Sequence, residues 1–84
     1  MQGEHKIKQL ANHYGRQAQT LKCIEEMAEL TQALLKNTNI AEEIADVEIM
    51  LEQIKYLYFI DNEEVGKIKD YKINRTLERI ANNG

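Results

Sequence analysis

The chain has 84 residues and a formal net charge of −3, so we expect one domain, residues 1–84, that does not bind nucleic acid. No apolar run approaches the roughly 20 residues of a membrane span, and the opening MQGEHKIK lacks the apolar core of a signal peptide. The only cysteine, Cys23, cannot form an internal disulfide and is typical of a packed thiol in a reducing compartment. These features predict a cytoplasmic protein with no membrane partner.

The composition predicts an all-α fold, because the chain has no proline, only four glycines and no β-type alternation of apolar residues. Apolar side chains at Ile7, Leu10 and Tyr14 recur at helical spacing and predict a first helix over about residues 4–14. Gly15 is expected to end it, because glycine adopts a positive φ freely. A second helix is expected over about residues 16–36.

The sequence NTN at residues 37–39 is expected to separate the second helix from a third. Asn39 would cap this third helix, which reaches about Tyr58, and Glu42 would complete a capping box. The fourth helix is expected over about residues 63–81, capped by Asp61 or Asn62. Short connections predict antiparallel neighbours, hence a small four-helix bundle. A domain of this size buries only about 60% of its surface, so self-association or a bound metal is expected to add stability.

Carboxylates on the second and third helices are the candidate functional groups. Glu25, Glu26 and Glu29 fall on the polar arc of the second helix, which alone is typical of a solvated face. On the third helix, however, Glu43 falls inside the apolar stripe and Asp46 falls at its edge. A buried carboxylate needs a partner. Three partners are candidates: the positive end of the helix dipole, a Lys or Arg of another helix, and a divalent cation.

The spacing of the acids favours the cation. Glu26 and Glu29 are three residues apart, as are Glu43 and Asp46, so each pair shares a helix face. In antiparallel helices the two pairs can face each other, and four adjacent carboxylates repel unless a cation neutralises them. Carboxylate oxygens suit Mg²⁺, with Mn²⁺ as a substitute. The cysteine and the two histidines have no zinc-site spacing, and the chain has no Glu-x-x-His pair of the di-iron type.

The motif EEMAEL at residues 25–30, followed by EEIAD at 42–46, resembles the EExxE…ExxD signature of the MazG-like all-α NTP pyrophosphatase superfamily. The similarity extends over most of the chain, to short single-domain members of phages and Gram-positive bacteria. It implies an Mg²⁺-dependent pyrophosphohydrolase that converts a nucleoside triphosphate into a monophosphate and pyrophosphate. It also implies a homodimer or tetramer. The catalytic and metal-binding residues that it implies are Glu26, Glu29, Glu43 and Asp46.

Two further groups of residues are candidates for contacts with a nucleotide. Lys72, Arg75 and Arg79 share one face of the fourth helix, and Lys72 and Arg75 lie in YKINR, which is similar to the phosphate-binding region of the family. A solvated basic face is the alternative. Base contacts are expected from three residues near the first helix junction, His13, Gln17 and Gln19. The chain departs from larger family members in having no tryptophan there.

Two classes of function follow from these patterns. The first is the enzyme, in which all four acids hold Mg²⁺ and one of them, Glu26 or Glu29, accepts a proton from water. The second is a catalytically weak helical homo-oligomer that binds a nucleotide or a protein. A third interpretation, a purely structural helical dimer in which the helix dipole stabilises Glu43, explains neither the second i, i+3 pair nor the intact joint pattern. The intact set of acids favours the enzyme.

Overall fold

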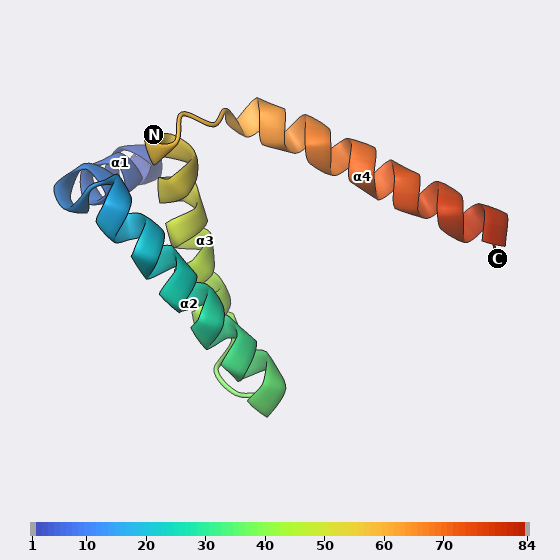
Figure 1. Cartoon of the computed structure of the whole chain (residues 1–84), viewed down its shortest axis with the longest axis horizontal. Helices are drawn as coiled ribbons and strands as arrows, with labels where there is room; N and C mark the ends of the chain where they lie inside the picture. Colours follow the sequence, from blue (N-terminus) through green and yellow to red (C-terminus); the bar gives the residue numbers. More distant parts are fainter. Residues whose placement is uncertain (1, 84) are drawn as a thin grey trace.

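The computed structural model describes residues 2–83, which form four α-helices and no strand in that range (Figure 1). Their bounds are close to the predicted ones, and the all-α class is confirmed. The helices are α1 (Gln2–Tyr14), α2 (Arg16–Lys36), α3 (Ile40–Leu57) and α4 (Asn62–Asn83). None of these helices combines the length and the apolar character that a membrane crossing would require.

An antiparallel hairpin of α2 and α3 forms the body of the molecule (Figure 1). Helix α1 packs across its open end, where Tyr56 of α3 donates a hydrogen bond to Asn12 of α1 at 3.1 Å. Gly15 makes the corner between α1 and α2 with a φ of +88°, as predicted, and its N–H donates to Ala11 at 2.8 Å. The apolar core is small and consists of Ala11, Cys23, Ala33, Val47 and Met50.

The tip of the hairpin is a short turn of two left-handed residues. Asn37 and Asn39 adopt φ values of 56° and 53°, a conformation that asparagine tolerates well. The N–H of Thr38 donates to Ala33 at 3.1 Å and closes the last turn of α2. The predicted capping box is wrong, because Asn39 makes no side-chain hydrogen bond at the start of α3. Its left-handed backbone departs from the extended conformation that a capping residue adopts.

A Schellman motif ends α3. The N–H of Ile60 donates to Lys55 at 2.8 Å, and that of Phe59 donates to Tyr56 at 3.3 Å. Phe59 itself occupies the left-handed position of the motif, with φ +57°. Asp61, one of the two residues predicted as the cap, then caps α4, because its carboxylate accepts the N–H of Glu63 at 3.1 Å.

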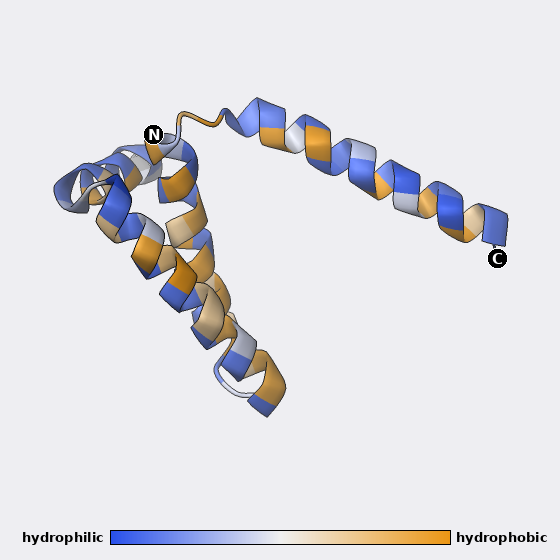
Figure 2. Ribbon diagram, in the orientation of Figure 1, coloured by the Kyte–Doolittle hydropathy of each residue, from blue (hydrophilic) through white to orange (hydrophobic). Residues whose placement is uncertain are grey.

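Helix α4 projects away from the other three helices and packs along none of them (Figure 1). Short connections were expected to give antiparallel neighbours. That holds for the hairpin, but α4 leaves α3 at a wide angle. None of the residues of α4 is buried, and hydrophobic positions recur along its length (Figure 2). Three helices thus form a bundle within the chain, and α4 stands outside it.

Candidate functional site

Three of the four predicted acids converge at the interface between α2 and α3. Oxygen atoms of Glu26, Glu43 and Asp46 lie within 4.8 Å of one another. A second group with the same mutual spacing comprises Glu25, Glu26 and Glu29. Glu26 belongs to both groups, so the five carboxylates form one connected cluster across the two helices.

The packing of the hairpin determines how deep each acid lies. Glu26 is only 7% exposed, because it occupies the edge of α2 that faces α3. The solvated-face interpretation therefore fails for Glu26, although Glu25 and Glu29 are exposed. Glu43 and Asp46 are half-buried on successive turns of α3. The cluster thus has a buried inner part and an exposed outer part.

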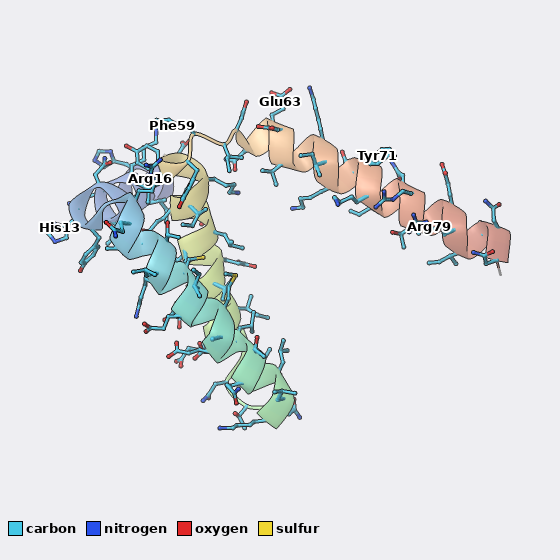
Figure 3. All side chains as sticks on the ribbon, viewed as in Figure 1. His13, Arg16, Phe59, Glu63, Tyr71 and Arg79 are labelled. Atoms are coloured by element: carbon cyan, nitrogen blue, oxygen red, sulfur yellow. The ribbon has the colours of Figure 1, made fainter. Side chains whose placement is uncertain are left out.

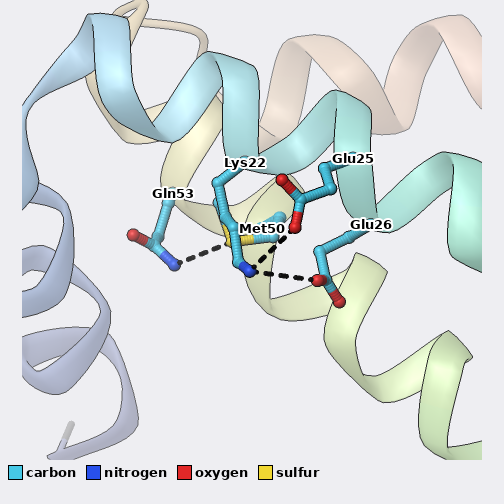
Figure 4. Close-up of polar contacts among 5 residues, drawn as sticks. All are labelled: Lys22, Glu25, Glu26, Met50 and Gln53. Carbon is cyan, nitrogen blue, oxygen red and sulfur yellow. Dashed lines mark hydrogen bonds and ion pairs between the residues drawn. The ribbon is translucent and has the colours of Figure 1, made fainter.

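Among the ion pairs within residues 2–83, the two that involve this cluster are both made by Lys22. Its Nζ lies 3.3 Å from Glu25 and 3.5 Å from Glu26, one turn along α2 (Figure 4). The hydrogen bond to Glu25, with the charge of that carboxylate, raises the pKa of Lys22 above its ordinary value, and Glu26 adds to the effect. Lys22 therefore compensates the α2 side of the cluster only.

The α3 side of the cluster has no such compensation. Within the described residues, Glu43 and Asp46 form no ion pair, and the Oε2 atom of Glu43 is buried without a hydrogen-bond partner. Desolvation raises the pKa of Glu43, and the charges of Asp46, Glu26 and Glu42 raise it further. Desolvation and the neighbouring Glu29 also raise the pKa of Glu26, against the opposing effect of Lys22. Glu26 and Glu43 therefore bind protons more tightly than isolated carboxyl groups do.

Of the partners considered for Glu43, the structure supports the helix dipole in part. Glu43 lies in the first turn of α3, where a negative charge is favourable. A Lys or Arg of another helix does not pair with it in the range 2–83. The dipole does not account for the orphaned oxygen, since a buried acceptor still needs a donor or a cation. A divalent cation fits the donor set, because all the ligand atoms are carboxylate oxygens.

A hollow of about 420 Å³ opens beside the cluster towards the tip of the hairpin. Glu25, Glu29 and Glu43 line one part of it, and Lys36 and Asn39 line another. It is therefore a concave space in which carboxylates and one cation face the same volume. A small anionic ligand that carries its own cation could contact both.

The predicted phosphate contacts lie far from the acids within one chain. Lys72 and Arg75 belong to α4, which projects away from the hairpin, as the labelled Tyr71 and Arg79 show (Figure 3). The guanidinium of Arg75 lies 5.5 Å from the ring centre of Tyr71. The structure of a single chain does not bring these basic residues to the carboxylates.

The predicted base contacts divide into exposed and buried residues. His13 is exposed (Figure 3), and its ring meets that of Tyr14 edge-on, with the two ring centres 4.6 Å apart. Gln17 is exposed and lines an open hollow with Arg16 and Tyr58. Gln19 lies in the interface between α2 and α3 at 7% exposure, and its amide donates to the side chain of Gln53 at 2.8 Å.

Three contributors were missed by the sequence reasoning. Lys22 precedes Glu25 and Glu26 by three and four residues, a spacing from which the ion pairs could have been predicted. Gln53 falls at a core position of α3, but a glutamine at a core position does not by itself identify its partner. Lys36 is the last residue of α2, and nothing in the local sequence indicates that it borders the hollow.

Comparison with known proteins adds no assignment: no family model, no curated protein and no solved structure matches this chain.

Proposed function

We propose that the chain is an Mg²⁺-dependent nucleoside triphosphate pyrophosphohydrolase, which cleaves a (d)NTP into a (d)NMP and pyrophosphate. One observation supports this proposal above the others. Glu26, Glu43 and Asp46 meet from two helices, and a buried oxygen of Glu43 has no protein partner. The resemblance of EEMAEL and EEIAD to the MazG-like signature supplies the reaction class.

In this proposal Glu26, Glu43 and Asp46 would hold Mg²⁺, and Glu29 would be the fourth carboxylate of the site. When bound, Mg²⁺ neutralises charge on the phosphoryl oxygens and lowers the pKa of a coordinated water. Glu29 is the better candidate for accepting the proton from water, because it is exposed and lies outside the inner group of three. Glu26 belongs to both groups and is better suited to positioning the metal ion. Mn²⁺ is the expected substitute metal.

The triphosphate would occupy the hollow beside the cluster, where Lys36 offers a positive charge. Lys72 and Arg75 stay in the proposal as phosphate contacts, but they could reach the acids only from another copy of the chain. A homodimer or tetramer is therefore part of the proposed function, as is the cytoplasm, where nucleoside triphosphates are found. For the base, exposed His13 and Gln17 are favoured over buried Gln19.

A catalytically weak nucleotide- or protein-binding module is the second candidate. The observation that favours it is the distance between α4, with its basic residues, and the carboxylates in one chain. A protein that lacked phosphate contacts at its acids would hold a nucleotide without cleaving it efficiently.

The test is pyrophosphate release from a panel of canonical and modified (d)NTPs, with and without Mg²⁺. Glu43→Gln should abolish release, because it removes the carboxylate whose oxygen lacks a protein partner. Glu48→Gln is the matched control: it changes an exposed acid of the same helix outside both groups and should leave release unchanged. Release that continues in Glu43→Gln would refute the assignment. Mg²⁺ binding without release from any nucleotide would favour the binding module.

A further inference from the structure

An apolar groove lies between α2 and α3 on the edge of the hairpin away from the carboxylates. It encloses about 280 Å³, and its lining includes Cys23, Ile24, Met27, Leu51, Ile54 and Tyr58. Ile24 and Glu26 are two residues apart, so they point about 200° apart around α2. Ile24 is 55% exposed, which is unusual for an isoleucine in a groove of this kind. An occupant of the groove would leave the acidic cluster accessible.

Helix α4 presents an apolar stripe that packs along none of the other helices in residues 2–83. Val65, Ile73, Leu77 and Ile80 fall on one side of the helix at helical spacing. Ile73 and Ile80 remain 54% and 63% exposed. An amphipathic helix of 22 residues gains most of its stability by packing its apolar face, so α4 needs another surface that covers this face.

The chain exposes more surface than a compact monomer of its mass would, and the excess fits an interface with a protein partner. The chain exposes 6890 Å², whereas a compact monomer of 9.8 kDa exposes about 5,200 Å². The excess of about 1,700 Å² per chain equals the share that each subunit contributes to a large homodimer interface. The radius of gyration, 15.8 Å, likewise exceeds the value of about 12 Å that a compact domain of this length has.

Phe59 provides independent support for a contact at the vertex between the hairpin and α4. It is 91% exposed, and its side chain extends from the α3–α4 connection (Figure 3). It also adopts a φ of +57°, which is unfavourable for a bulky residue and which asparagine adopts twice elsewhere in this chain. The strained backbone and the exposed ring of Phe59 are both explained if the ring becomes buried when a partner binds, since aromatic residues dominate the energetics of interfaces.

We propose that a second copy of this chain packs the apolar stripe of its α4 into this groove, reciprocally, and buries Phe59 in the same interface. The 21 residues of α2 and the 22 of α4 have nearly equal lengths, so one helix can follow the whole of the other. The α4 of the same chain reaches the groove only by reversing direction at residues 58–61. The Schellman motif there directs it away. With α4 in this groove, Lys72 and Arg75 of the same helix lie on the edge away from the acids, so the phosphate contacts of the proposed function would come from the α4 of a further copy, as in a tetramer. The interface itself does not depend on the proposed nucleotide chemistry.

Sedimentation equilibrium of the full chain tests the interface, with circular dichroism to verify helicity. The wild type should be dimeric or tetrameric, and Ile73→Glu should weaken association at least about a hundredfold, because each symmetric interface loses the contact twice. Tyr71→Glu is the matched control, since Tyr71 lies on the same helix about 200° away from Ile73. It should associate as the wild type does. Equal effects of the two substitutions would overturn the proposal.

Two more variants test the groove and the contact at Phe59. Ile24→Glu should dissociate the assembly as Ile73→Glu does, because the groove and the stripe are the two sides of one contact. Phe59→Asn should weaken association about tenfold or more while preserving helicity, because asparagine relieves the left-handed strain and removes the ring. Unchanged association of either variant would remove that residue from the interface. A wild-type chain that is monomeric up to about 1 mM would overturn the whole proposal. A radius of gyration near 12 Å would then show that α4 folds onto its own groove.

Discussion

The buried pair of Gln19 and Gln53 yields a stability prediction whose size can be worked out from the structure. Gln53 is 2% exposed and accepts the Gln19 amide at 2.8 Å. Its own amide makes only long contacts, of 3.5 Å to the Ile49 carbonyl and 3.5 Å to the Met50 sulfur, and Figure 4 shows the contact with Met50. Gln53→Met keeps the volume of the side chain and leaves the amide of Gln19 buried without its acceptor. An unsatisfied buried polar group of this kind destabilises by about 1–3 kcal/mol.

For a domain of this length, each kcal/mol lowers the melting temperature by roughly 4–8 °C. We therefore expect Gln53→Met and Gln19→Met each to lower it by about 5–20 °C. The double variant should melt near the wild-type temperature, because replacing both partners by apolar groups of similar shape is nearly neutral. The assay is thermal unfolding at one protein concentration. Additive losses in the double variant would show that the two amides are not a coupled pair.

The same variants decide the role of Gln19 in nucleotide binding. If Gln19 only joins α2 to α3, the double variant recovers both stability and nucleotide preference. If Gln19 contacts the base, stability returns and the preference changes, which pyrophosphate release across the nucleotide panel would detect. Gln17→Met serves as the comparison, because Gln17 is exposed and lacks this partner.

Three further predictions concern the carboxylates. Glu43→Gln should raise the melting temperature at pH 8 in the presence of a chelator, because it removes a desolvated charge that Asp46 and Glu26 repel; a lower temperature would refute this. Burial and repulsion raise the pKa values of Glu43 and Glu26 in the folded chain. Protonation of these two groups therefore stabilises the fold fully below the ordinary carboxyl pKa range, and this stabilisation is lost as the pH rises through their raised pKa values. Saturating Mg²⁺ should therefore increase the melting temperature by several degrees more at pH 8 than at pH 5, and equal shifts would contradict the site. Lys22→Met should tighten Mg²⁺ binding several-fold in titration calorimetry, since the ammonium competes for Glu26, and weaker binding would show that Lys22 helps to hold the site.

Much of the local structure could be predicted because it depends on local chemistry. Helical spacing located all four helices, and Gly15 and Asp61 have the roles expected of a positive-φ glycine and an N-cap. The cap at Asn39 was predicted wrongly, because the hairpin turn requires its backbone to be left-handed. A tertiary requirement there overrode a local preference.

The candidate site could be predicted in part for a related reason. Glu43 and Asp46 were identified from the apolar stripe of one helix, and the structure brings them to Glu26. The depth of Glu26 could not be predicted, because the angle at which α3 crosses α2 decides which edge of the polar arc is buried. The direction of α4 could not be predicted either. Amphipathic spacing shows that a face must be covered but does not identify the surface that covers it.

The turn of residues 37–39 has a consequence for which changes of length the chain tolerates. Surface loops usually accept insertions, since few contacts depend on them. Here, one residue inserted between Asn37 and Asn39 and absorbed into α3 would rotate that helix by about 100° relative to α2 and shift it by about 1.5 Å. The helices would still pair, but Glu43 would no longer face Glu26. Related chains that keep the carboxylate pair should therefore keep the length of this turn even where its residues differ.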